Sequence, residues 1–105
     1  MIVLFDQEYL KELYVSGRCR DKRYRYQPSI VSKYVWIIKL MCSLDDVDGL
    51  NNFNSLHYER LKGDKLGLSS VRINKKYRIE FKEIAEEGEL VASICNIIRI
   101  SNHYK

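Results

Sequence analysis

The strongest constraint on the fold comes from two neighbouring runs, Ser-Val-Arg-Ile-Asn (70–74) and Tyr-Arg-Ile-Glu-Phe (77–81). In each run every second residue is apolar, which is typical of a β-strand with one buried face, so the pair predicts a β-hairpin. A two-residue turn would pair Val71 with Arg78 and place charges among the core residues. A three-residue connection pairs Val71 with Ile79 and keeps one face apolar, because side chains alternate with a period of two. We therefore predict the three-residue connection.

This register places two like charges directly opposite each other. Arg72 faces Arg78 across the strand pair, and opposed like charges destabilise a sheet. One explanation is a pair of solvated arginines held apart, with Glu80 or Asp64 between them. The other is an anion site in which both guanidinium groups converge on a phosphate. The residues alone leave both explanations open.

Length and composition predict a single globular domain over residues 1–105. A chain of 105 residues with 46% hydrophobic content can bury its own core, and a net charge of +4 is compatible with a polyanionic partner. The three cysteines are far apart and form no Cys-x-x-Cys motif, which predicts reduced thiols in the cytoplasm. The two histidines, His57 and His103, have no partners at metal-ligand spacing, so neither a metal site nor a cofactor is predicted. No apolar stretch is long enough to span a membrane.

The N-terminal half predicts a strand followed by two helices. Residues 2–5 are a β-branched and aromatic run, and Asp6 is positioned to cap a helix that begins at Gln7 and ends at Gly17. A second helix is predicted from Pro28 to about Leu44. Its apolar stripe is wide enough to require packing on a sheet. The stripe consists of Ile30, Tyr34, Ile37, Ile38 and Met41.

The C-terminal half predicts the rest of the sheet. Residues 90–100 are apolar at both odd and even positions, which predicts a strand that is buried on both faces and central in the sheet. With the hairpin, this strand makes a three-stranded antiparallel run. The predicted fold is α+β, with two N-terminal helices packed on a small twisted antiparallel sheet.

A basic segment between the two predicted helices is a second candidate for nucleic-acid contact. Residues 18–26 hold five basic side chains, with tyrosines between them. A solvated charge run is the simplest interpretation. The alternative is contact with a phosphate backbone, with Tyr24 or Tyr26 available for stacking on a base.

Four blocks of the C-terminal half together resemble one known protein family. They are Leu-Lys-Gly-Asp (61–64), the two hairpin runs, and the terminal Asn-His-Tyr-Lys (102–105). In order and spacing they are similar to the RelE/ParE toxin superfamily, in particular its HigB-like members, with active-site residues like those of YoeB toxins. The resemblance implies a RelE-like fold, which agrees with the architecture predicted above.

The resemblance also implies catalytic roles in metal-independent RNA cleavage. The neighbouring 2′-hydroxyl would attack the phosphate and leave a 2′,3′-cyclic phosphate. Glu59 holds the position of the general base, Arg78 that of the phosphate-stabilising arginine, and His103 that of the acid. Tyr104 corresponds to a substrate contact and Arg72 to the arginine of the Arg-Ile-Asn block. His57 is a rival for the base, because many HigB relatives have a histidine at the position of Glu59.

The wider expectation is a toxin of a type II toxin–antitoxin system that cleaves mRNA on the ribosome. Its partners would be the ribosome, mRNA and a cognate antitoxin, usually a helix-turn-helix, HigA-like protein in HigB pairs. The alternative is a ParE-like toxin that binds and poisons DNA gyrase without cutting RNA. The candidate RNA-binding residues are Lys62, Lys65, Lys76, Arg18, Arg20, Arg23 and Arg25.

Overall fold

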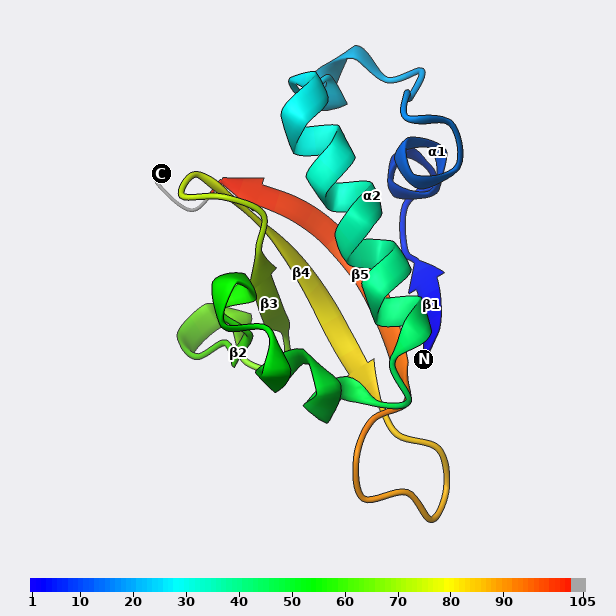
Figure 1. Ribbon diagram of the computed structural model, residues 1–105, viewed down its shortest axis with the longest axis vertical. Coiled ribbons are helices and arrows are strands. Elements are labelled where there is room, and N and C mark those ends of the chain that lie inside the picture. The colour runs from blue at the N-terminus through cyan, green and yellow to red at the C-terminus, as the bar shows by residue number, and fades with distance from the viewer. Residues whose placement is uncertain (103–105) are drawn as a thin grey trace.

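The computed structural model describes residues 1–102, which form a five-stranded sheet and two α-helices (Figure 1). The strands are β1 (Ile2–Phe5), β2 (Glu59–Arg60), β3 (Ser69–Arg72), β4 (Tyr77–Ile84) and β5 (Ile94–Asn102). The helices are α1 (Glu8–Ser16) and α2 (Pro28–Ser43), and short 3₁₀ helices are η1 (Lys22–Tyr24), η2 (Val47–Asn52), η3 (Asn54–Leu56) and η4 (Gly63–Lys65). The predicted α+β class is confirmed.

The sheet is mixed rather than purely antiparallel. Its strand order is β1-β5-β4-β3-β2. The β3–β4 and β4–β5 pairs are antiparallel, as predicted, and β2 also pairs antiparallel with β3. The edge strand β1, however, runs parallel to β5, which the prediction of an antiparallel sheet missed. The second difference is β2, which adds a short edge strand where the sequence predicted only a loop.

The predicted hairpin register is confirmed. Arg72 pairs with Arg78 and Val71 with Ile79 across β3 and β4. The backbone N–H of Ile73 donates to the carbonyl of Tyr77 at 2.9 Å, which closes a connection of three residues. The Asn74 side-chain oxygen accepts hydrogen bonds from the backbone N–H groups of Lys76 and Tyr77, both at 2.8 Å. An asparagine side chain that accepts such bonds fixes a turn locally, which is why this loop has one register.

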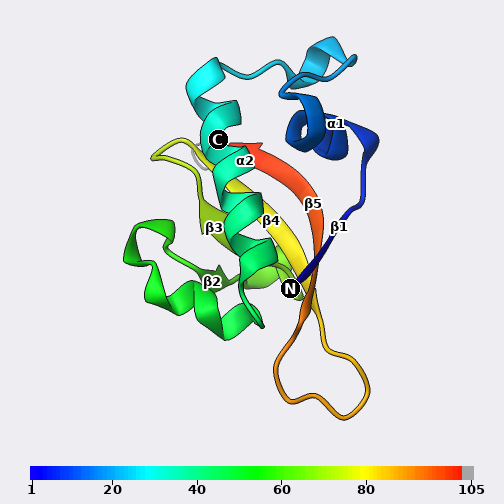
Figure 2. The same ribbon diagram turned by 45° about the vertical axis from the view of Figure 1, so that its right-hand side comes forward.

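Helix α2 lies across one face of the sheet and supplies the centre of the core (Figures 1 and 2). All five residues of the predicted stripe are buried. The Tyr34 hydroxyl donates to the Leu10 carbonyl at 2.8 Å and so ties α2 to α1. At 16 residues α2 is the longest helix, and none of the helices within residues 1–102 is long and apolar enough to cross a membrane.

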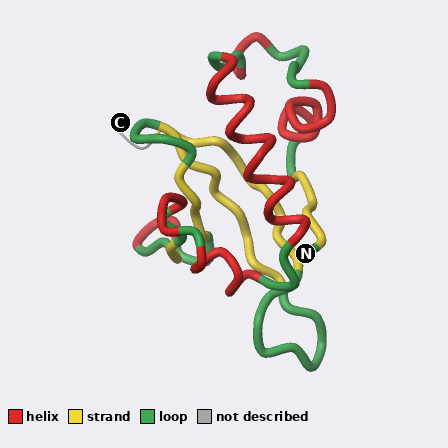
Figure 3. The backbone as a smooth tube through the Cα atoms, viewed as in Figure 1, coloured by secondary structure: helices red, strands yellow, loops and turns green. Residues whose placement is uncertain are grey.

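The last strand differs from its prediction in position and in burial. It begins at Ile94 rather than Leu90, which is fully exposed in a loop extending from the end of the sheet (Figure 3). A β-bulge explains the misleading pattern. Phe81 pairs with Ile97, whereas Ile79 pairs with Ile100, so one extra residue of β5 interrupts the alternation. The strand has neighbours on both sides but buries only the face towards the helices.

The first helix begins one residue later than predicted, and Asp6 does not cap it. The backbone N–H of Asp6 instead donates to the carbonyl of Ile97 at 2.8 Å, which continues the pairing of β1 with β5. Gln7 precedes the helix without a side-chain cap, and its amide donates to Ile98 at 2.9 Å. The predicted end at Gly17 is confirmed, with φ at +76° in the left-handed region that favours glycine.

Candidate active site on the polar face of the sheet

The face of the sheet opposite α2, here called the polar face, carries two cross-strand rows of polar side chains. The first row follows the pairings Glu59–Ser70, Ser70–Glu80 and Glu80–Arg99 across four strands. The second follows Arg72–Arg78 and Arg78–Ser101. Because residues two apart in a strand share a face, burial of Val71, Ile79 and Phe81 against α2 forces these neighbours onto the opposite side. The apolar pattern of the hairpin therefore builds the polar face.

A small pocket opens between the two rows. It is lined by His57, Glu59, Ser70, Arg72 and Arg78, and its volume is about 30 Å³. That space accommodates about two water-sized groups, which suits phosphate oxygens but not a whole nucleotide. Both predicted arginines and both candidate bases thus line one pocket.

Arg78 is held between two carboxylates without a hydrogen bond to either. Its Nη1 lies 3.8 Å from Oε1 of Glu59, and its Nε lies 3.7 Å from Oε2 of Glu80. The Nε atom is buried and has no hydrogen-bond partner among residues 1–102. A buried guanidinium N–H without an acceptor is unfavourable unless an acceptor arrives. This arrangement leaves donors available for an anion in the pocket.

Glu80, which the sequence suggested only as a possible group between the two arginines, is buried at the centre of a cluster of cations. Its side chain is fully buried and accepts from Lys65 Nζ at 2.6 Å, Arg99 Nη1 at 2.5 Å and Ser101 Oγ at 3.0 Å. Burial alone would raise the pKa of Glu80, but the hydrogen bonds from these three side chains outweigh it and hold the pKa below its ordinary value. Glu80 is therefore ionised, and Arg99 becomes a further cation of the polar face.

The two candidate bases differ in their surroundings. The Glu59 side chain is 59% exposed and faces Arg78. His57 is exposed and follows η3 with φ at +47°, a left-handed conformation that is uncommon for a residue with a side chain. Such backbone outliers gather at functional sites when the surrounding structure holds them in place. The pocket includes both groups and does not decide between them.

The remaining predicted contacts lie outside the pocket lining. Lys62 and Lys76 are exposed, and Lys65 is the residue bound to Glu80. The basic segment between α1 and α2 lies at the helical end of the molecule (Figure 1). Its four predicted arginines, Arg18, Arg20, Arg23 and Arg25, are absent from the lining of the pocket around Arg78.

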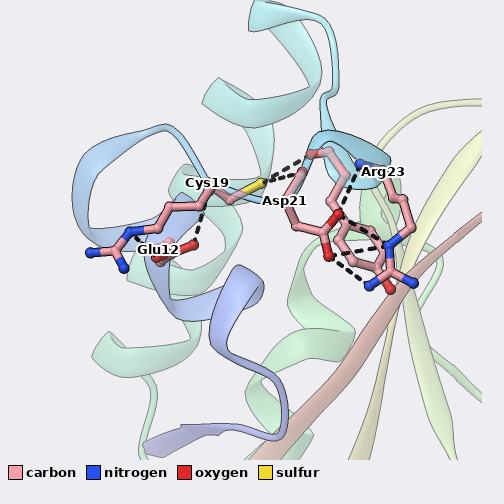
Figure 4. Close-up of polar contacts among 6 residues, drawn as sticks. Glu12, Cys19, Asp21 and Arg23 are labelled. Carbon is pink, nitrogen blue, oxygen red and sulfur yellow. Dashed lines mark hydrogen bonds and ion pairs between the residues drawn. The ribbon is translucent and has the colours of Figure 1, made fainter.

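Two of the five basic residues in this segment are engaged in local ion pairs (Figure 4). Arg23 Nη2 lies 2.6 Å from Asp21, and Arg20 Nε lies 3.6 Å from Glu12. The ring of Tyr24 is stacked on Tyr9 with centroids 3.6 Å apart, so one of its faces is covered. Arg20 and Arg23 keep exposed charge for a polyanion, whereas the Tyr24 ring has Tyr9 stacked on it and the Arg23 guanidinium over it at 5.3 Å, so it is not an open platform for a base.

Two predicted catalytic residues, His103 and Tyr104, lie outside the described residues. The last described residue, Asn102, pairs with Tyr77, and Ser101 pairs with Arg78. Within residues 1–102, no group of three His, Cys, Asp or Glu side chains is arranged to hold a metal ion.

Solved structures that share this fold include one that is named as a toxin. No family model matches the sequence, and a search of curated proteins finds no match either. The YoeB/ParE toxin from Agrobacterium tumefaciens has a TM-score of 0.54 at 19% identity, covering 99% of this chain and 100% of that one. YafQ from E. coli strain BL21(DE3) has a TM-score of 0.56 at 10% identity, and a YafQ mutant from E. coli has 0.56 at 12%. Both cover 96% of this chain and 91% of theirs.

These comparisons establish an α+β fold of the RelE-like toxin type. The likeness extends over nearly the whole chain, so it includes both helices and every strand that carries a site residue. At identities below 20% it defines the architecture, and the chemistry has to be argued from this chain's own side chains.

Proposed function

We propose that this protein is the toxin of a type II toxin–antitoxin system, a HigB-like member of the RelE/ParE superfamily with active-site residues like those of YoeB. In this proposal it is an endoribonuclease that cleaves mRNA on the ribosome. The observation that carries the proposal is the pocket in which Arg72, Arg78 and Glu59 meet. Two guanidinium groups and a carboxylate at one anion-sized pocket are the groups that 2′-hydroxyl attack on a phosphodiester requires.

The chemical steps follow from the positions of these groups. Glu59, or His57 as its rival in the same pocket, takes the proton from the 2′-hydroxyl as that oxygen attacks the phosphorus. Arg78 donates hydrogen bonds from its free nitrogen atoms to the phosphorane oxygens, where negative charge develops. His103 then gives a proton to the departing 5′-oxygen, and Tyr104 contacts the substrate. The products are a 2′,3′-cyclic phosphate and a 5′-hydroxyl.

Binding of the longer RNA is assigned to basic residues near the pocket and at the helical end, all of them exposed except Lys65, which is half-buried against Glu80. Electrostatic contact with phosphates is sequence-independent and falls with salt, so this assignment predicts salt-sensitive binding. The proposed partners are the ribosome, mRNA and a cognate helix-turn-helix antitoxin, and the proposed compartment is the cytoplasm. The residues are Lys62, Lys65, Lys76, Arg18, Arg20, Arg23 and Arg25.

The test is cleavage of mRNA on translating ribosomes by purified protein. Arg78→Ala and His103→Ala should each lower the single-turnover rate about 100-fold or more, the usual worth of a charge stabiliser or a general acid. Lys39→Ala removes the same charge from the exposed side of α2 and should keep the wild-type rate. Wild-type rates in both site variants would overturn the assigned roles.

The identity of the product tests the mechanism separately. Mass spectrometry of the cleaved fragments should find a 2′,3′-cyclic phosphate, and 2′-O-methylation at the cleaved nucleotide should abolish the reaction. A 5′-phosphate product would refute attack by the 2′-hydroxyl. Growth arrest accompanied by DNA damage and intact mRNA would instead indicate the ParE-like action on gyrase.

A further inference from the structure

Glu80 is unusual among the carboxylates of this chain because it is fully buried and surrounded by cations. Lys65 and Ser101 bind one of its oxygens and Arg99 binds the other, while Arg78 lies 3.7 Å away. Three cationic side chains face one negative group, so the cluster keeps a net positive charge. A buried carboxylate needs such partners to remain ionised. The question is what this cluster does beyond holding the sheet together.

The contact with Arg78 differs from the other contacts of Glu80. Lys65 and Arg99 donate hydrogen bonds of 2.6 and 2.5 Å, whereas Arg78 Nε is outside hydrogen-bond distance and has no other partner among residues 1–102. At 3.7 Å the carboxylate still attracts the guanidinium group in a site of low dielectric. Glu80 thus constrains Arg78 by charge without accepting a hydrogen bond from its Nε.

A second glutamate on the same strand provides an internal comparison. Glu83 is nearly buried, and it accepts from Ser69 Oγ at 2.6 Å, from Arg60 Nη2 at 3.3 Å and from the Tyr58 hydroxyl. It lies three residues along β4, on the side of Phe81 and the helices, and it does not line the pocket around Arg78. Glu83 resembles Glu80 in burial and in number of partners but differs in facing away from that pocket.

We infer that Glu80 is a positioning residue, which holds Arg78 with its donors directed at the phosphate and does not itself touch the substrate. This inference rests on the proposed function, because the phosphate is that of the RNA. Positional precision of this kind contributes to rate, since a displacement of about 1 Å at a reacting group costs up to about 100-fold. Lys65 and Arg99 complete the arrangement by neutralising Glu80 in its buried position.

The test compares Glu80→Gln with Glu83→Gln at a temperature where both variants are folded. Removing the negative charge of Glu80 makes the pocket more positive, so RNA should bind as tightly as to wild type or more tightly. The saturated cleavage rate of Glu80→Gln should nevertheless fall about 10-fold or more, because Arg78 is no longer held in place. Glu83→Gln should keep the wild-type rate, and Glu80→Asp should recover part of the lost rate.

Three results would overturn the inference. Equal rates in the two glutamine variants would make Glu80 structural only. A faster Glu80→Gln variant would mean that Glu80 merely reduces the positive charge of the site. Weaker binding with an unchanged saturated rate would also contradict a positioning role.

Hydrogen exchange at Arg78 tests this inference without RNA cleavage and therefore independently of the proposed function. The Nε–H of Arg78 should give a slowly exchanging ¹H–¹⁵N signal in wild type, because the atom is buried. In Glu80→Gln the exchange should accelerate several-fold, and in Glu83→Gln it should not. If wild type cuts no RNA but this difference is found, the proposed function fails while the role of Glu80 in holding Arg78 stands. Equal exchange in all three proteins would refute that role.

Discussion

Replacing Arg72 with glutamine should stabilise the fold while impairing the site. Arg72 lies directly opposite Arg78, and within residues 1–102 it forms no ion pair, whereas Arg78 has carboxylates at 3.7 and 3.8 Å. Removing the Arg72 charge therefore breaks no described ion pair and relieves a direct repulsion. Opposed like charges in a sheet cost about 0.2–1 kcal/mol, so we expect a gain of about 0.5 kcal/mol in the free energy of unfolding. For a domain of this size that is a rise in Tm of about 2–4 °C.

The assay is urea and thermal unfolding at low and at high salt. Screening shortens the range of the repulsion to about 3 Å at 1 M salt, so the gain from Arg72→Gln should largely disappear there. Arg60→Gln is the matched control, because it removes an arginine that lies 3.3 Å from Glu83. The control should be slightly less stable than wild type at low salt, because it loses an exposed ion pair, and this loss should shrink at high salt.

Lower stability of Arg72→Gln than of wild type at low salt, or an equal gain at both salt concentrations, would refute a repulsion between Arg72 and Arg78. Cleavage of RNA by Arg72→Gln at the wild-type rate would refute a role of Arg72 in the site. If Arg72→Gln is more stable and less active than wild type, then the charge of Arg72 serves activity at a cost in stability.

Two further predictions concern stability. Tyr34→Phe removes the buried hydrogen bond to Leu10 and should lower the free energy of unfolding by about 1 kcal/mol in urea titration. Tyr14→Phe is the control and should be neutral, because the Tyr14 hydroxyl has no hydrogen bond within residues 1–102. Equal losses in the two variants would refute the role of the Tyr34 hydrogen bond. The pKa of Glu80 is lower in the folded protein than its ordinary value of 4.5, so its contribution to stability is fully present above that value and is lost as pH falls through the lowered folded pKa. The urea midpoint should therefore fall more steeply below about pH 5 in wild type than in Glu80→Gln, and parallel pH profiles would contradict this.

The elements that the sequence predicted well are those specified by local pattern. The register of the hairpin follows from the alternation in 70–74 and 77–81, because a slip of one residue would place Arg78 in the core. The stripe of α2 follows from the helical period, and all of its predicted core positions are buried. In both cases the apolar residues must all lie on one buried face, and only one register or helix orientation allows that.

The elements that were predicted wrongly depend on contacts between distant segments. The bulge opposite Phe81 changes which residues of β5 face the core, and no local pattern marks it. The parallel pairing of β1 joins the two ends of the described chain. Glu80 occupies an alternating polar position and resembles a solvated strand residue, but partners 15 residues earlier and 19 residues later bury it. The roles of His103 and Tyr104 remain predictions.

The candidate site differs from an ordinary polar surface because its groups are in unfavourable electrostatic, hydrogen-bonding or backbone environments. The Glu83 cluster holds a carboxylate, an arginine, a tyrosine and a serine, and each of its partners donates to the carboxylate. In the pocket, by contrast, Arg72 opposes Arg78, the Nε of Arg78 has no acceptor among residues 1–102, and His57 has a left-handed backbone. Each feature is locally unfavourable, and all three involve residues that line a single pocket of about 30 Å³. Local conflicts that converge in this way are expected where function rather than stability determines the residues, and a phosphate bound between Arg72 and Arg78 would relieve the first of them.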